Sequence, residues 1–116
     1  MNIQDMKASA EQAAGLMRVL ANEKRLLLLC LLFEEEQSVG ALVDRLGARQ
    51  SAVSQQLAQL RREGIVTTRR DGQYVYCRLA SDEARRVLEV LYGIYCAPEP
   101  AGDRPEPVTE SSESTR

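Results

Sequence analysis

Residues 49–79 have the sequence RQSAVSQQLAQLRREGIVTTRRDGQYVYCRL, in which a helical pattern is followed directly by a hairpin pattern. Val53, Leu57 and Leu60 recur at spacings of three and four residues, which is typical of the buried face of a helix. Beyond this helix, two runs of β-branched and aromatic residues flank Asp71-Gly72, a dipeptide that strongly favours a tight hairpin turn. The stretch therefore predicts one helix and one β-hairpin, in that order.

A shorter helix is expected immediately before this one. Ser38 is a good N-cap for it, and Gly47 is a residue that commonly ends a helix. The apolar positions between them share one face: Val39, Leu42, Val43 and Leu46. Two short helices joined by about three or four residues, of which the second is polar on its free face, form a helix-turn-helix.

Three more helices complete the predicted fold. Residues 6–20 have the spacing of an amphipathic helix, Asn22 caps a helix that contains the apolar run 26–33, and Ser81 caps a last helix. The run 26–33 is rich in leucine and has no β-branched residue, so we expect a central helix buried nearly all round. The order α-α-α-α-β-β-α is mainly α with a β-hairpin wing. It predicts a winged helix-turn-helix domain.

The domain occupies residues 1–96, and its first and last helices both carry apolar faces. Because a domain of this size has a limited core, we expect a homodimer in which these two helices pair. Residues 97–116 hold all four prolines and five acids against two bases, a net charge of −3. This composition predicts a disordered acidic tail.

The whole chain has a net charge of −2, but the charge is unevenly distributed. Residues 45–78 hold seven arginines against two acids, a net of +5, which favours double-stranded DNA as a partner. Short polar and amide side chains can hydrogen-bond to base edges, and arginines beside a wing tip suit phosphate or minor-groove contact. The candidate DNA-binding residues are Arg49, Gln50, Ser51, Ser54, Gln55 and Gln56 on the helix, and Arg69, Arg70 and Gln73 on the wing. The acidic run 34–36 is expected to be a solvated helix end.

Several classes of protein are excluded or disfavoured. The chain has no histidine, which excludes Ser-His-Asp and Cys-His catalysis and imidazole-dependent zinc sites. Its three cysteines lack a CxxC motif, which argues against a disulfide scaffold and a thioredoxin-type enzyme. The longest apolar run is far shorter than the roughly 18 to 20 residues that span a bilayer, and the N-terminus does not resemble a signal peptide. We expect a cytoplasmic protein with no cofactor, metal or membrane partner. A Cys-dependent redox enzyme and a winged helix used only for protein contacts remain as alternatives.

Residues 46–79 resemble the DNA-binding region of the ArsR/SmtB family of bacterial winged-helix repressors. The segments SAVSQQLAQLRREGIV and RRDGQYVYCRL carry the likeness, which extends over residues 6–96. The resemblance implies a dimeric transcriptional repressor that binds operator DNA. Two positions depart from the family pattern: Arg49 replaces a helix-capping serine, and Gln56 replaces a histidine. We expect the first change to weaken the cap while adding a phosphate contact, and the second to alter operator preference.

The resemblance also bears on the signal that the repressor senses. The family's metal-binding box falls on residues 36–42, where its two cysteines are replaced by Ser38 and Gly40. Cys30 in LLLLCLL and Cys96 in LYGIYC instead resemble the thiol-based BigR/SqrR-type branch, in which such a pair reacts with persulfides or oxidants to form a di- or polysulfide bridge. This implies a repressor whose operator affinity falls when the pair reacts. Arsenite or another thiophilic species is the alternative inducer, and the remaining cysteine has no assigned role.

Overall fold

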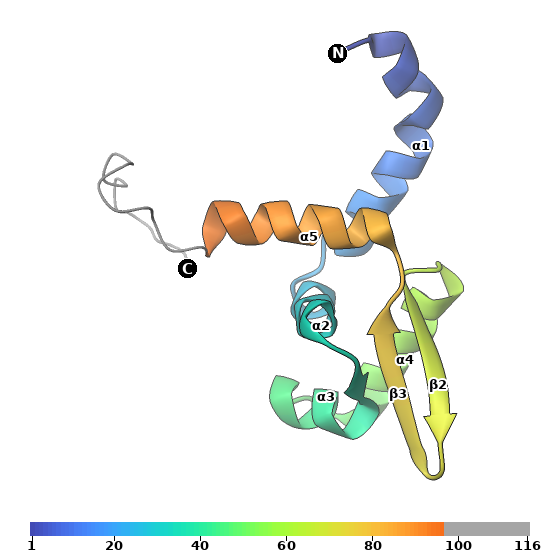
Figure 1. Ribbon diagram of the computed structural model, residues 1–116, viewed down its shortest axis with the longest axis vertical. Coiled ribbons are helices and arrows are strands. Elements are labelled where there is room, and N and C mark those ends of the chain that lie inside the picture. The colour runs from blue at the N-terminus through green and yellow to red at the C-terminus, as the bar shows by residue number, and fades with distance from the viewer. Residues whose placement is uncertain (97–116) are drawn as a thin grey trace, which may run out of the picture.

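The computed structural model describes residues 1–96, which form five helices and three strands (Figure 1). In chain order these are α1 (Ile3–Leu20), α2 (Glu23–Glu34), β1 (Gln37–Ser38), α3 (Val39–Leu46), α4 (Gln50–Arg62), β2 (Val66–Asp71), β3 (Tyr74–Leu79) and α5 (Asp82–Tyr95). The predicted winged helix-turn-helix order is confirmed, with β1 as an additional short strand. The tail predicted at 97–116 lies outside the described residues.

The helices begin and end at the residues that their local sequence favours. Side-chain oxygens of Asn22, Ser38 and Ser81 accept hydrogen bonds from backbone N–H groups in the first turns of α2, α3 and α5. Gly47 ends α3 in the left-handed conformation, with φ at 62°, which glycine adopts without a steric penalty. Arg49 precedes α4 and makes no side-chain cap hydrogen bond, as expected where an arginine replaces a serine.

The wing consists of β2 and β3, and β3 also pairs with β1 on its other side. Both pairings are antiparallel, and Gly72 at the tip has φ of +65°, which suits the predicted tight turn. With only two residues, β1 is too short to show the alternation that identifies a strand in a sequence. Its Gln37 is buried, and the side-chain nitrogen Nε2 donates to the carbonyl oxygen of Leu31 at 3.4 Å.

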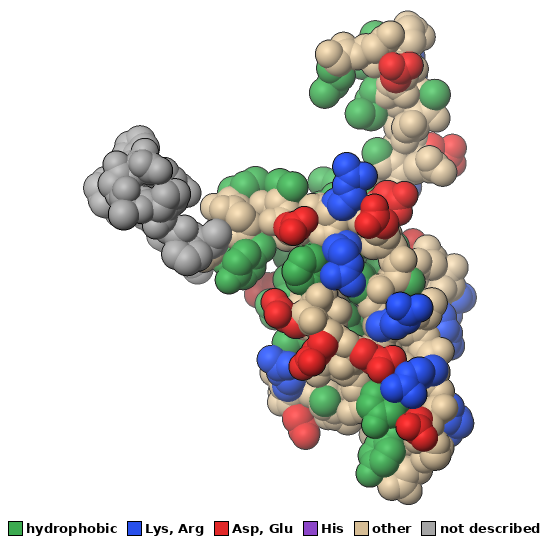
Figure 2. Space-filling model, in the orientation of Figure 1, with side chains coloured by type: hydrophobic (Ala, Val, Ile, Leu, Met, Phe, Trp, Pro, Cys, Tyr) green, Lys and Arg blue, Asp and Glu red, His purple; other side chains and the backbone are tan. Residues whose placement is uncertain are grey.

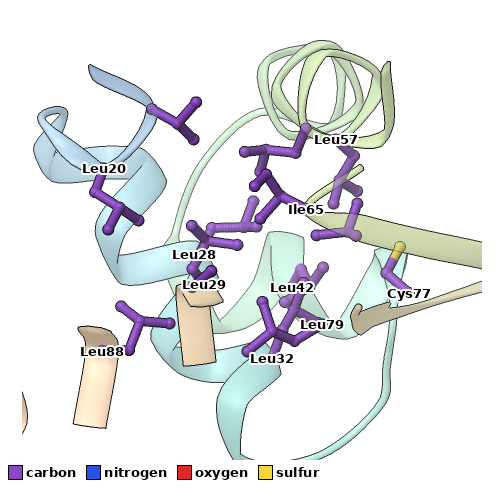
Figure 3. Packing of buried hydrophobic residues seen from close by; sticks show 14 of the residues in the cluster. Leu20, Leu28, Leu29, Leu32, Leu42, Leu57, Ile65, Cys77, Leu79 and Leu88 are labelled. Carbon is purple, nitrogen blue, oxygen red and sulfur yellow. The ribbon is translucent and has the colours of Figure 1, made fainter. Parts of the chain in front are cut away.

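The core lies where α2 meets the other helices and the sheet (Figure 3). The largest of its fully buried side chains are Leu28, Leu29, Leu32, Leu42, Leu60, Val66 and Cys77. The expectation that α2 is buried nearly all round is wrong, because Leu27 is 52% exposed and Cys30 is exposed as well. Contacts from α1, α3, β3 and α5 leave one strip of α2 uncovered.

The first and last helices extend beyond this core. Figure 1 shows α1 projecting away from the domain, and Figure 2 shows apolar side chains along α1 and the outer half of α5. Among the apolar residues of α1, Leu20 is buried, whereas Met6 and Met17 are exposed. The exposed large apolar side chains of α5 are Val90, Tyr92, Ile94 and Tyr95.

A groove of about 880 Å³ separates α1 from α5. Its apolar lining includes Leu16 and Val19 from α1 and Val87 and Leu91 from α5. The groove thus continues the apolar faces of both helices. Within residues 1–96, no helix combines the length and the apolar character needed to cross a membrane.

Candidate DNA-binding surface and thiol pair

Helix α4 has one buried face and one polar face. Val53, Leu57 and Leu60 belong to the core, and this burial fixes which way the helix is turned. The predicted DNA-binding residues of its first two turns are exposed: Gln50, Ser51, Ser54 and Gln55. Arg49, just before the helix, is exposed too, and Gln56 is half-buried. The amides and hydroxyls therefore lie together at the N-terminal end of α4, where the backbone N–H groups attract anions.

The structure brings this end of α4 close to the wing. A groove of about 380 Å³ lies between them and is lined by Gln50 and Ser54 from α4 and by Gln73 at the wing tip. Thr68 and Val75 line the same groove from β2 and β3. The polar residues predicted on α4 and those predicted on the wing thus lie on one surface.

The two wing arginines lie on opposite faces of the hairpin. In the ladder, Arg70 pairs with Val75 and Arg69 pairs with Tyr76. Successive side chains of a strand point to opposite faces, and directly paired residues share a face. Since Val75 lines the groove beside α4, Arg70 lies on the face towards α4, and Arg69 lies on the other face.

Arg69 is engaged by a partner that the sequence analysis missed. Its Nε and Nη2 donate hydrogen bonds to the two carboxylate oxygens of Glu36, each at 2.9 Å. Its guanidinium carbon lies 4.6 Å from the centre of the Tyr76 ring, and Nη1 lies 3.9 Å from Asp71. The hydrogen bonds from Arg69 lower the pKa of the Glu36 carboxyl, and Glu36 raises the pKa of Arg69. Glu36 lies beyond the end of α2 and is not merely part of a solvated helix end.

The cysteines occupy three different environments. Cys30 lies on the uncovered strip of α2, Cys96 is the exposed residue that ends α5, and both are free thiols. Cys77 is buried in the core, which raises the pKa of its thiol. The pKa of Cys30 is also raised, first by partial loss of surrounding water and then by the charges of Cys96 and Glu34.

Helices α2 and α5 are also joined by an arginine. Arg85 Nη1 donates to the carbonyl oxygen of Phe33 at 3.3 Å, and its guanidinium lies 5.0 Å from the centre of the Phe33 ring. The contact fixes the end of α2 against the first turns of α5. Cys30 and Cys96 therefore belong to two helices that already pack together.

The residues at the family's metal-binding box do not fit a thiolate metal site. Ser38 Oγ accepts a hydrogen bond from the backbone N–H of Ala41 at 3.0 Å and so caps α3, and Gly40 offers no ligand. In residues 1–96, no three or more His, Cys, Asp or Glu side chains are grouped so as to hold a metal ion.

Comparison with known proteins identifies the family. The sequence pattern described as "Bacterial regulatory protein, arsR family" matches residues 22–68. The chain is 46% identical to the transcriptional activator HlyU of Vibrio cholerae over 83% of its own length and 89% of that protein.

Solved structures agree with the sequence matches. The transcriptional repressor BigR from Xylella fastidiosa superposes with a TM-score of 0.79 at 41% identity, covering 84% of this chain and 100% of that one. A homodimeric winged helix-turn-helix DNA-binding domain from Mycobacterium bovis gives a TM-score of 0.67 at 32% identity, over 78% and 84% of the two chains. These relatives are described as a transcriptional activator, a transcriptional repressor and a DNA-binding domain. The chain therefore belongs to the arsR family of bacterial regulatory proteins and is a DNA-binding transcriptional regulator.

Proposed function

We propose that the chain is a homodimeric repressor that releases its operator when Cys30 and Cys96 react with a persulfide, a polysulfide or an oxidant. One observation carries this proposal. Two free, exposed thiols lie on α2 and at the end of α5, and these two helices pack together. The reducing cytoplasm, where such a regulator would meet DNA, leaves these thiols free until a specific reactant arrives.

The first part of the proposal concerns how DNA is bound. The exposed amides and hydroxyls of Gln50, Ser51, Ser54 and Gln55 hydrogen-bond to base edges in the major groove, with half-buried Gln56 at the border of this surface. Arg49 and the wing residues Arg70 and Gln73 contact the backbone on either side. Arg69, the other wing arginine, donates two hydrogen bonds to Glu36.

The second part concerns the dimer. The exposed apolar side chains of α1 and α5, and the groove between these helices, are surfaces that a second copy would cover. The winged helix relative from Mycobacterium bovis, which is described as homodimeric, supports the formation of a dimer. In a dimer the two α4 helices must be about 34 Å apart to enter successive major grooves, so a small change in the angle of α5 alters binding.

The third part is the thiol chemistry. The Cys96 thiolate attacks a sulfur atom of a polysulfide, the S–S bond of the polysulfide breaks, and the shorter fragment leaves with the electron pair. The Cys30 thiolate then attacks the sulfur bonded to Cβ of the Cys96 persulfide, forming a Cys30–Cys96 disulfide and expelling hydrosulfide. The two thiols lose two protons and two electrons, and the polysulfide accepts the electrons. We assign the first attack to Cys96 because the surroundings of Cys30 raise the pKa of the Cys30 thiol. Less of Cys30 is then present as the nucleophilic thiolate.

The bridge acts by favouring one dimer geometry over the other. It ties α2 to the end of α5, and α5 contributes to the proposed dimer interface. A conformational change follows only if the bridge stabilises the released geometry more than the bound one. Arsenite, the alternative inducer, would span the same two thiols without oxidising them.

The test is DNA binding by Cys30→Ser and Cys96→Ser before and after polysulfide treatment, with the intact mass recorded each time. Both variants should bind as tightly as the reduced wild type and should not be released. Cys77→Ala, which removes a buried thiol outside the pair, should be released normally. Parallel samples treated with peroxide and arsenite distinguish the inducers, because a disulfide lowers the mass of the chain and bound arsenic raises it. Release of the Cys30→Ser/Cys96→Ser double variant would contradict the thiol switch.

A further inference from the structure

Glu36 and Arg69 connect the body of the domain to the wing. Glu36 lies between α2 and β1, and Arg69 lies in β2 near the hairpin tip. Two hydrogen bonds of 2.9 Å join the guanidinium fork to both carboxylate oxygens, a pairing that fixes orientation as well as distance. The Tyr76 ring of β3 packs against the same guanidinium at 4.6 Å. The pair therefore anchors both strands of the wing.

Arg70 has a different environment from its neighbour. It is exposed, lies on the face of the hairpin towards α4, and forms no ion pair with another residue in the described part of the chain. Arg69 lies on the opposite face and is held by Glu36. The two adjacent arginines therefore do not serve the same surface.

We infer that Glu36 is a positioning residue of the wing: it holds Arg69 as a strut against the domain body, so that Arg70 and the hairpin tip contact the DNA backbone. The inference rests on the proposed contact between the wing and DNA. It separates two arginines that the sequence presents as equivalent phosphate ligands.

The strut matters for the outer half of the wing, because Val66, Cys77 and Leu79 bury only the inner ends of β2 and β3 in the core. A projecting two-stranded hairpin is marginally stable on its own, and the pairing of β3 with β1 involves only Gln37 and Ser38 of β1. A wing free to swing would lose entropy when it binds DNA, and this loss would weaken binding. For Arg69 itself to bind a phosphate, it would first have to break two charge-assisted hydrogen bonds.

The test measures the affinity of the full chain for a mixed-sequence duplex at several salt concentrations. The duplex has about 30 base pairs, which is long enough for the two protomers of a dimer to bind one helical turn apart. Each neutralised phosphate contributes about −0.9 to the slope of log K against log salt concentration. Arg70→Gln, which removes one contact from each wing of a dimer, should flatten this slope by about 1.8.

Variants of the strut should behave differently. Arg69→Lys keeps the positive charge but loses the bidentate fork, so it should weaken binding by about two- to fivefold, as expected for an exposed ion pair, without changing the slope. Glu36→Gln should weaken binding to a similar extent relative to Glu35→Gln. This control removes the same charge from the adjacent position, and Glu35 forms no ion pair among residues 1–96. The Glu36→Gln/Arg69→Lys double variant should bind DNA no more weakly than the weaker-binding single variant. The reason is that all three variants lose the same bidentate pairing between residues 36 and 69.

Two results would overturn the inference. One is tighter binding by Glu36→Gln than by Glu35→Gln, which would mean that Glu36 withholds Arg69 from DNA. The other combines two measurements: Arg69→Lys binds DNA as tightly as the wild type, and Arg69→Gln flattens the salt slope as much as Arg70→Gln does. Together they would make Arg69 a phosphate ligand. A wild-type protein that does not bind the duplex would instead contradict the proposed DNA contact, and this result is known before any variant is compared.

Discussion

Cys30 combines an exposed position with a raised pKa. Its side chain reaches solvent on α2, yet the groups around it remove enough water to disfavour the thiolate. The charges of Cys96 and Glu34 add to this effect. Since the thiolate is the nucleophile, Cys30 is better suited to resolve a persulfide on Cys96 than to attack an inducer itself.

Replacing Cys96 by serine should make Cys30 ionise at lower pH, because one of the charges that raise its pKa is removed. In the wild type, the midpoint of the pH profile for alkylation of Cys30 by iodoacetamide should lie above the ordinary thiol value of about 8.5. In Cys96→Ser it should move towards that value, although burial keeps it raised. Peptide mass spectrometry gives both profiles, with Cys77→Ala as the control. An identical midpoint in Cys96→Ser would mean that the two thiols do not interact.

Single residues of α4 should determine base preference. Ser54→Ala or Gln55→Ala should cost about 1–3 kcal/mol on a duplex selected by the wild type from a random pool, because hydrogen bonds to base edges are lost. Binding to unselected DNA should change much less. Gln59→Ala, further along the exposed side of the same helix, is the matched control. Equal losses on selected and unselected DNA would show that these side chains do not read bases.

The elements differ in how far the sequence alone predicts them. Helices α2, α3 and α5 were predictable because Asn22, Ser38 and Ser81 cap them locally, and the wing because Asp71-Gly72 determines its own turn. The polar face of α4 followed from the positions of its buried residues. In each case the deciding residues are close together in the chain.

Other features depend on contacts between distant segments and were not predictable. Strand β1 exists because the wing docks beside it, and Glu36 meets Arg69 only when that happens. Leucine-rich composition indicated that α2 is buried nearly all round, but it does not reveal which side the neighbouring elements leave open. Cys30 is exposed for this reason.

The junction of α2 and α5 should depend on Arg85. Arg85→Gln loses the hydrogen bond to the Phe33 carbonyl and the contact with the Phe33 ring, so the free energy of unfolding should fall by about 1 kcal/mol. Urea denaturation measures this change. Arg62→Gln, on the exposed end of α4, should stay within about 0.5 kcal/mol of the wild type. Equal stabilities of the two variants would mean that the contact does not hold these helices together.

The molecule as a whole leaves large apolar side chains exposed on both α1 and α5. Sedimentation at micromolar concentration should therefore give a dimer. Met6→Asp combined with Ile94→Asp should favour the monomer while leaving it folded, since both side chains are exposed in one protomer. A wild-type monomer under these conditions, or a double variant that is as dimeric as the wild type, would contradict the proposed interface.

The central claim is that a bridge between Cys30 and Cys96 lowers the affinity of the dimer for DNA. Its most direct test treats the full chain with polysulfide, maps the linkage by peptide mass spectrometry, and measures binding of that sample to the selected duplex before and after reduction by dithiothreitol. We predict a linkage between Cys30 and Cys96 within one chain, affinity lowered by about 5- to 150-fold, as is typical of coupling between sites, and full recovery on reduction. A sample with this linkage that binds DNA as tightly as the reduced protein would contradict the claim.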